Sequence, residues 1–274
     1  MDTAILLATY NSSKYIREQL DSLYNQTYKD WILYVHDDGS NDNTLDIITE
    51  YKKRYKNIVL LGEEIKHLGP KKNFMYLLNN VQADYYFFCD HDDVWFENKV
   101  ELSLREIQNM ELGNKNIPVI FHSDLTVVDG KLNVISQSMW KYAKIIPDLM
   151  HRRNYVMTSC YITGCTLSIN NAAKKLIPPM PENAIMHDWW IGIHAVLQNM
   201  KIISWHQSTM LYRLHGANDS GIPRVTIIKY LKRIIGSLFI SNYDRHVKPF
   251  VKKYGIKHYS WFKTLLILRK LSSK

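Results

Sequence analysis

The feature that most constrains the fold of this chain is the alternation of short apolar segments with amphipathic ones in its first third. The apolar segments predict buried strands at 3–9, 31–36, 58–61 and 85–89. The segments between them carry apolar residues at helical spacing and predict helices at 13–27, 44–55 and 73–80. Because strands that alternate with helices form right-handed βαβ units, the sequence predicts an α/β fold with a mainly parallel sheet.

The remainder of the chain is less regular. Further short strands are predicted at 119–121, 126–128, 164–169, 202–205 and 209–212. A helix is predicted to begin in the segment MHDWWIGIHAVLQ, after the proline-rich loop PPMPEN. From residue 225 onward, apolar residues recur at helical spacing with Lys and Arg between them. We therefore expect an α/β body followed by a basic, amphipathic helical extension.

Composition and length narrow the class of protein. The 274 residues are 46% hydrophobic and 22% charged, which excludes a disordered or fibrous chain. The three cysteines show no CxxC spacing, so a disulfide framework or zinc ribbon is not expected and a reducing compartment fits. No apolar run approaches the roughly 18–20 residues of a membrane span, and the acidic N-terminus is unlike a secretory signal. The sequence therefore predicts a cytoplasmic protein.

The net charge of +9 is unevenly distributed. Residues 224–274 contain 13 Lys and Arg and one acid, whereas the rest of the chain carries a balance of −3. Such asymmetry predicts attraction to a polyanion, either an anionic membrane surface or a nucleic acid. A solvated basic tail, or a helix that packs its apolar stripe on the body, is the alternative.

Polar clusters follow three of the predicted strands. TYN (9–11), DDGS (37–40) and DHDD (90–93) come after the first, second and fourth strands. In an open α/β sheet, ligands bind beyond the carboxyl ends of the strands. The sequence therefore predicts one site formed by these three turns.

The cluster Asp90-His91-Asp92-Asp93 is the strongest chemical signal. Unpaired carboxylates are costly to bury, so three of them after a core strand indicate a bound cation. Oxygen ligands with a neighbouring imidazole suit Mn²⁺ or Mg²⁺ better than a soft metal. The alternative is a helix N-cap, for which Asp93 is the best candidate, ahead of a helix at 97–110.

Two further loops fit phosphate or nucleoside binding. In DDGS, glycine permits a tight turn, although such a turn is also common between a strand and a helix. The basic loop HLGPKKN (67–73) opens a helix, and helix N-termini attract phosphate. Neither GxGxxG nor GxxxxGK[ST] is present, so the sequence supports neither dinucleotide-binding nor P-loop chemistry.

Two motifs in the second half combine polar and aromatic residues. His187-Asp188-Trp189-Trp190 places a carboxylate beside two indoles, which suits a proton acceptor next to a surface that stacks on sugar rings. A helix with buried tryptophans is the alternative. In YRLHGAN (212–218), His215 is a candidate metal or diphosphate ligand, although a lone histidine is more often structural.

Taken in order, these motifs resemble those of the family-2 glycosyltransferases, which have the GT-A fold. ATYN, DDGSNDNT, DHDDVW with Lys99, GCTLSIN, HDWW and YRLHGAN carry the resemblance over residues 3–220. They are most similar to the bacterial polysaccharide rhamnosyltransferase-like branch. The resemblance implies a catalytic GT-A domain at 1–220 and places the basic extension at 221–274. His91 and His187 depart from the family pattern, which commonly has Gln and Glu there.

The resemblance also implies roles for individual residues. Nucleotide-binding roles fall to Thr9, Tyr10, Asn11, Asp38, Lys72, Asn73 and Asp90. Asp92 and His215 would ligate the metal, and Asp188 would be the catalytic base. Trp189 and Trp190 would face the acceptor.

The function implied is an inverting glycosyltransferase dependent on Mn²⁺ or Mg²⁺. Its donor would be dTDP-L-rhamnose or a UDP-hexose. Its acceptor would be a saccharide, expected to be lipid-linked, in synthesis of a cell-surface polysaccharide such as capsule or O-antigen. This places the protein peripherally at the inner face of the bacterial cytoplasmic membrane, with no nucleic acid as partner. The alternatives are a metal-dependent phosphoesterase or nucleotidyltransferase, and a basic nucleic-acid-binding protein.

Overall fold

The structure, a computed structural model, describes residues 2–143, 145–152, 156 and 161–215. The predicted extension at 221–274 lies outside the described residues. The strands are β1 (Thr3–Thr9), β2 (Ile32–Asp37), β3 (Ile58–Leu60), β4 (Tyr85–Cys89), β5 (Val94–Trp95), β6 (Val119–Val128), β7 (Val134–Ser136), β8 (Ser168–Asn170) and β9 (Lys201–Arg213). The helices are α1 (Ile16–Tyr24), α2 (Thr44–Arg54), α3 (Pro70–Asn80), α4 (Lys99–Glu111), α5 (Met139–Ala143), α6 (Pro147–Met150), α7 (Asn171–Leu176) and α8 (His187–Leu197), with a 3₁₀ turn, η1, at Gly164–Thr166.

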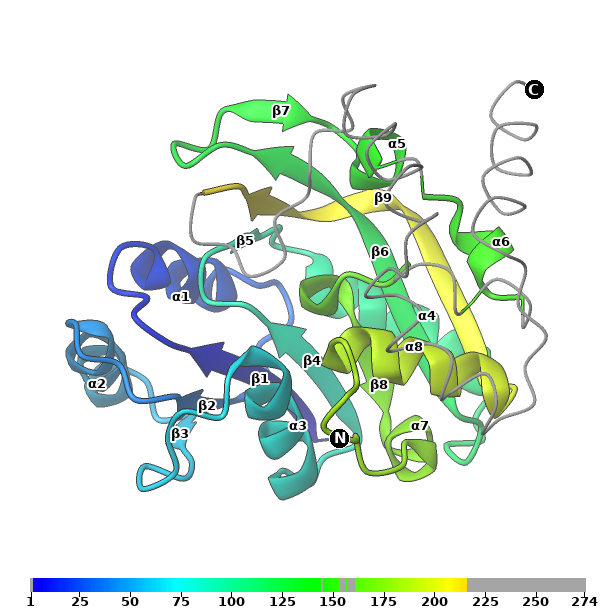
Figure 1. The fold of residues 1–274 in the computed structure, drawn as a ribbon, viewed down its shortest axis with the longest axis horizontal. Coiled ribbons are helices and arrows are strands. Elements are labelled where there is room, and N and C mark those ends of the chain that lie inside the picture. Colours follow the sequence, from blue (N-terminus) through cyan, green and yellow to red (C-terminus); the bar gives the residue numbers. More distant parts are fainter. Residues whose placement is uncertain (1, 144, 153–155, 157–160, 216–274) are drawn as a thin grey trace.

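The described strands form one nine-stranded sheet in the order β3-β2-β1-β4-β8-β6-β9-β5, with β7 paired to β6 (Figure 1). β1 to β4 pair in parallel, and β9 is parallel to β6. The short β8 runs antiparallel to both of its neighbours, β4 and β6. The predicted α/β fold with flanking helices is therefore confirmed, but the sheet is mixed. Four of the described strand pairings are parallel and four are antiparallel, so the expected parallel arrangement is continuous only over β1 to β4.

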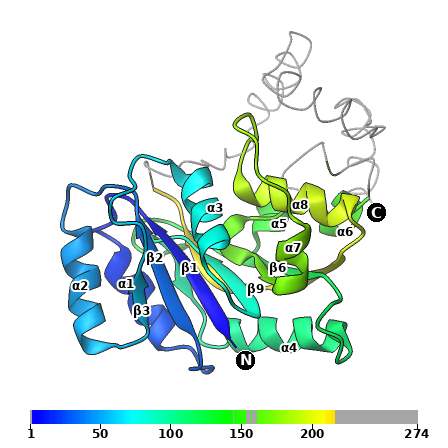
Figure 2. The same ribbon diagram turned by 90° about the horizontal axis from the view of Figure 1, so that it is seen from below.

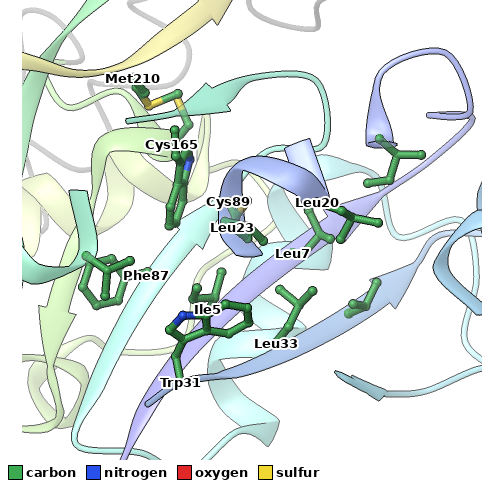
Figure 3. Close-up of a cluster of buried hydrophobic side chains, with 14 of the residues drawn as sticks. Ile5, Leu7, Leu20, Leu23, Trp31, Leu33, Phe87, Cys89, Cys165 and Met210 are labelled. Carbon is green, nitrogen blue, oxygen red and sulfur yellow. The ribbon is translucent and has the colours of Figure 1, made fainter. Parts of the chain in front are cut away.

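Helices cover both faces of this sheet, as Figure 2 shows from below. All seven residues of β1 are buried, and successive side chains point to opposite faces. Ala4 and Leu6 pack in the same core as Phe74 of α3 and Ile191 of α8. On the other face, Ile5 and Leu7 pack against α1, α2 and α4 in a second core (Figure 3), which includes Leu20, Leu23, Trp31 and Leu33.

Five of the predicted strands differ from the structure. The segments 119–121 and 126–128 are parts of one ten-residue strand, β6, and 202–205 and 209–212 are parts of β9. The predicted strand at 164–169 begins as the turn η1, and only its end joins β8. β9 carries a bulge, because Ser123 pairs with Trp205 whereas Asp124 pairs with Ser208.

Within the part of the chain that the structure describes, no helix is both long and apolar enough to cross a bilayer.

Candidate active site

The carboxyl ends of β1, β2 and β4 lie side by side, because the three strands are parallel neighbours. Thr9 is opposite Asp37, and Leu7 is opposite Cys89. The hydroxyl of Thr9 donates to Asp37 Oδ2 at 2.8 Å, so the first two turns are joined at the strand ends. The turns predicted to form one site therefore do meet at one edge of the sheet.

The turn after β1 contains an exposed aromatic residue, Tyr10, and a side-chain amide with a structural role, Asn11. Tyr10 is 49% exposed. Asn11 has a positive φ of 46°, and its side chain accepts from the backbone N–H of Asn41 at 3.0 Å. Its own backbone N–H donates to Ser40 Oγ at 2.8 Å. Asn11 therefore holds the first two turns together.

Asp38 ties the second turn to the loop before α3. Its carboxylate accepts the backbone N–H of Leu68 at 2.6 Å and that of Gly69 at 2.8 Å. Gly69, with φ of 73°, is the residue before Pro70, where α3 begins. A carboxylate has about four lone-pair positions, so these two bonds leave Asp38 able to accept another.

The predicted phosphate-binding residues of the basic loop have different surroundings. Asn73 is buried, and its side-chain oxygen lies 2.9 Å from Nδ1 of His36 at the end of β2. Lys72 is half-exposed and forms an ion pair of 2.8 Å with Glu182. The backbone oxygen of Glu182 also accepts from Lys71 Nζ at 2.6 Å. The basic loop is thus linked to the chain that leads into α8.

The acidic cluster at residues 90–93 lies next to His215, which comes two residues after the end of β9. His215 Nε2 lies 2.7 Å from Asp92 Oδ2, although the two residues are 123 positions apart in the chain. The imidazole of His215 also stacks on the ring of Tyr15, with ring centroids 4.8 Å apart. The two residues predicted as metal ligands are therefore neighbours.

Asp93 is the deepest acid of the cluster. It is fully buried, and burial together with the charges of Asp92 and Asp90 raises its pKa well above the usual value. One carboxylate oxygen accepts the backbone N–H of Arg213 at 3.1 Å. Asp90, Asp93 and the thiol of Cys165 place their ligand atoms within 4.8 Å of one another.

The interpretation of this cluster as a helix N-cap is wrong. Helix α4 begins only at Lys99, and Asn98 is its N-cap residue. β5 and a turn separate the helix from Asp93, because Val94 and Trp95 pair with β9 instead of entering the helix.

Two buried cations near the cluster were not singled out as site residues by sequence. Arg213 donates through Nε to the backbone oxygen of Asp92 at 2.8 Å and through Nη2 to Glu18 at 2.5 Å. Lys99 donates to the backbone oxygen of Cys165 at 3.1 Å, and burial lowers its pKa to about 8. Arg213 belongs to YRLHGAN, and Lys99 was quoted together with DHDDVW. Membership in these motifs was the sequence signal that could have identified both residues.

Asp188 lies in the first turn of α8 and contacts η1. Its Oδ2 accepts the backbone N–H of Gly164 at 2.9 Å, and its Oδ1 accepts that of Trp189 at 2.6 Å. A Cβ atom on Gly164 would lie 2.8 Å from His187 Nε2, which is closer than real contacts allow. The glycine of GCTLSIN therefore lets the turn approach the helix that carries Asp188.

His187 packs into an aromatic environment. Its ring centroid lies 4.3 Å from that of Phe74 and 5.6 Å from that of Phe88. Burial lowers its pKa to about 3, so the imidazole is neutral at physiological pH. His187 therefore contributes no charge beside Asp188.

Trp189 and Trp190 do not form the exposed surface for stacking on sugar rings that the sequence predicts. Their exposed fractions are 4% and 1%, and both belong to the core between the sheet and α8. The indole N–H of Trp190 donates to the backbone oxygen of Pro178 at 2.9 Å. The structure thus corrects the expectation that these rings face an acceptor, because packing α8 onto the sheet buries them. The alternative, a helix with buried tryptophans, describes the observed packing.

Comparison with known proteins places this geometry in a family. The model of the family described as "Glycosyl transferase family 2" matches residues 4–166. The dTDP-rhamnosyl transferase RfbG of Shigella flexneri is 29% identical over 230 residues, covering 78% of this chain and 73% of that protein. A poly(ribitol-phosphate) beta-glucosyltransferase of Bacillus spizizenii is 29% identical over 150 residues, covering 48% of this chain and 23% of that protein.

Solved structures share the fold. Residues 1–349 of S. aureus TarS in complex with UDP superpose with a TM-score of 0.59 and 22% identity, over 78% of this chain and 61% of that one. The mannosyltransferase PcManGT of Pyrobaculum calidifontis, in complex with GDP-Man and Mn²⁺, superposes with a TM-score of 0.56 and 13% identity. The match covers 80% of this chain and 58% of that one. The sheet with its flanking helices is thus that of the GT-A glycosyltransferases. Because the family model spans more than half of the chain and its motifs meet at one edge of the sheet, this chain belongs to glycosyl transferase family 2.

Proposed function

We propose that this glycosyltransferase is an inverting, metal-dependent enzyme that moves a sugar from a nucleotide diphosphate to a saccharide hydroxyl. The observation that carries the proposal is the meeting of Asp92 with His215 at the carboxyl edge of the sheet, with Asp188 on α8. Membership in the family favours this function over the phosphoesterase, nucleotidyltransferase and nucleic-acid-binding interpretations.

The metal would be Mn²⁺ or Mg²⁺, held by Asp92 and His215. Carboxylate oxygen and imidazole nitrogen are ligands that suit these ions. Asp90, of the same motif, has its ligand atom within 4.8 Å of those of Asp93 and Cys165. Burial raises the pKa of the nearby Cys165 thiol, so this group stays protonated and is a poor ligand. The metal supplies charge neutralisation on the diphosphate leaving group.

The nucleotide of the donor would bind at the first two turns. Tyr10 offers an exposed ring face for the base, and Asp38 retains lone pairs that can accept a pyrimidine N–H. Thr9, Asn11 and Asn73 would fix the turns that surround the nucleoside. Lys72 would exchange Glu182 for a donor phosphate, because their ion pair is solvent-exposed.

Asp188 would accept the proton of the attacking hydroxyl. Two backbone N–H groups fix the orientation of its carboxylate, whose two oxygens together offer about four acceptor positions. The base would remove the proton while the hydroxyl attacks the anomeric carbon from the face opposite the leaving diphosphate. Such a one-step displacement inverts the anomeric centre. Trp189 and Trp190 would support this acceptor site from the core, since both rings are buried.

We expect dTDP or UDP to stabilise the protein more than GDP or ADP does. The pyrimidine edge presents an N–H that Asp38 can accept, and we expect the larger purine ring to fit this position less well. The name of the Shigella relative supports a dTDP-linked rhamnose as donor. Thermal-shift measurements with each nucleotide and Mn²⁺ check this, and an equal shift with GDP would count against the base-binding role of Asp38.

The acceptor is proposed to be a lipid-linked saccharide of a surface polysaccharide, met at the cytoplasmic membrane face. The basis is the sequence at 224–274, with 13 basic residues and one acid. We expect the chain to co-sediment with anionic vesicles at low salt, at roughly 1 kcal/mol per basic residue near the surface. A chain truncated after Pro223 should stay in solution. Equal partitioning of the two proteins would contradict membrane docking.

A further inference from the structure

A second group of ligand-type side chains lies away from the candidate active site. His122 on β6 is opposite Ser204 on β9, and His151 follows directly after α6. The two imidazole Nε2 atoms are 3.4 Å apart. Ser204 Oγ lies 2.9 Å from the Nε2 atom of His122 and 3.0 Å from that of His151. Three potential donor atoms therefore form a small triangle two strands away from β4.

Both imidazoles carry a form suited to metal binding. His122 is fully buried, and burial lowers its pKa to about 3. Burial also lowers the pKa of His151. Neutral imidazole, not imidazolium, is the metal-ligating form. Both rings therefore present a lone pair at neutral pH without first having to lose a proton.

We propose that His122 and His151 are two ligands of a divalent transition-metal site of the zinc type, with His206 as the third. Tetrahedral Zn²⁺ with Zn–N bonds of about 2.0–2.1 Å holds its nitrogen ligands about 3.3–3.4 Å apart. The observed separation of 3.4 Å between the two Nε2 atoms matches this value. A modest tilt of the half-buried His151 ring would direct both lone pairs toward one ion.

His206 and Asp148 lie near this pair, and a side-chain rotation is needed to bring either of them to it as a further ligand. His206 is two residues beyond Ser204 on β9, and its exposed ring contacts Trp140, which also contacts His122. Its Nε2 lies 3.7 Å from Asp148 Oδ2, and Asp148 is three residues before His151. Because the side chains of His206 and Asp148 are 64% and 70% exposed, they can turn inward at little cost.

The same triangle differs from a serine nucleophile with its base. Such a site has one histidine base beside the hydroxyl, whereas two imidazole Nε2 atoms lie beside Ser204 Oγ, at 2.9 and 3.0 Å. The imidazole-rich donor set also differs from the oxygen-rich acidic cluster, so the two sites should prefer different metals.

The test is titration of the full-length protein with Zn²⁺ by calorimetry, in excess Mg²⁺ to occupy the oxygen-rich cluster. We expect one Zn²⁺ per chain, with affinity reduced at least tenfold in His151→Gln, which removes one half-buried ligand. His206→Gln should weaken binding as well. His67→Gln, which removes an exposed imidazole from a loop on β2's side of the sheet, is the matched control and should bind as wild type does.

Co²⁺ gives a second readout that does not depend on affinity. A tetrahedral Co²⁺ site with imidazole ligands absorbs strongly in the visible range, whereas an octahedral oxygen site does not. The proposal requires this band in the wild type and its loss in His151→Gln. It is overturned if His151→Gln binds Zn²⁺ as tightly as the wild type. It is equally overturned if Cys165→Ser alone abolishes binding, because the ion then belongs to the acidic cluster.

Discussion

Asp92→Asn is expected to lower the rate of sugar transfer at least about a hundredfold, the scale of losing a major electrostatic stabiliser. Asp92 lies 2.7 Å from His215, and the two are the proposed ligands of the metal that neutralises the leaving diphosphate. Asparagine keeps the size of the side chain but removes its charge, so the fold should persist. Initial rates with a dTDP- or UDP-sugar, measured at several Mn²⁺ concentrations, provide the check.

The matched control for this substitution is Asp84→Asn, at the opposite end of β4. Asp84 forms a largely exposed ion pair with Lys115 at 3.0 Å, which contributes little to stability. Its loss should leave the rate within about twofold, because it removes one carboxylate far from the site. Nucleotide affinity should rise with Mn²⁺ in Asp84→Asn and lose most of that dependence in Asp92→Asn. Full activity of the wild type in excess EDTA would exclude a metal from the reaction.

The parallel half of the fold could be predicted because its signals are local. Each strand from β1 to β4 is a continuous apolar segment bounded by polar turns, and the helices between them show a clear apolar stripe. The antiparallel half was harder, because Asp124 interrupts the apolar pattern of β6. Its carboxylate accepts the backbone N–H of Trp140 at 3.1 Å and the hydroxyl of Ser138, which satisfies it within a buried strand. That compensation comes from residues after the strand and is invisible in the local pattern.

The site was predictable only in part for a similar reason. The turns of the carboxyl edge follow from strand order, whereas the approach of His215 to Asp92 joins two ends of the domain. No periodicity encodes that contact. The sequence indicated it only through the candidate-ligand interpretation of His215 and through the family resemblance. Arg213 illustrates the same limit, because a fully buried arginine is rare and is explained here by its bonds to Asp92 and Glu18.

The indoles of the HDWW motif show how one pattern supports two structures. Two adjacent tryptophans beside a carboxylate suit either a sugar-binding surface or a buried helix face. The structure places both rings in the core, since every residue of α8 from His187 to Val196 is buried. Helix burial on this scale depends on what covers α8, which the sequence of the helix does not reveal.

Asp188→Asn is expected to lower turnover by about 10²–10⁴-fold, the range that general bases contribute. The amide cannot accept the proton of the acceptor hydroxyl. Donor affinity should stay near the wild-type value, because the carboxylate of Asp188 accepts backbone N–H groups of η1 and of its own helix. Single-turnover rates and the Kd for dTDP or UDP, measured on the same preparations, separate the two effects.

A structural contribution from Asp188 must be measured alongside, because both of its oxygens accept backbone N–H groups. In asparagine one of these positions becomes an NH₂ facing an N–H donor, and an unsatisfied buried group costs about 1–3 kcal/mol. A lower Tm is therefore expected in Asp188→Asn, whereas Asp30→Asn, at an exposed position between α1 and β2, should change neither Tm nor turnover appreciably. Assays at temperatures well below the lowered Tm ensure that unfolding does not contribute to the measured loss of turnover. If donor affinity then falls as much as turnover does, Asp188 shapes the binding site and another group accepts the proton.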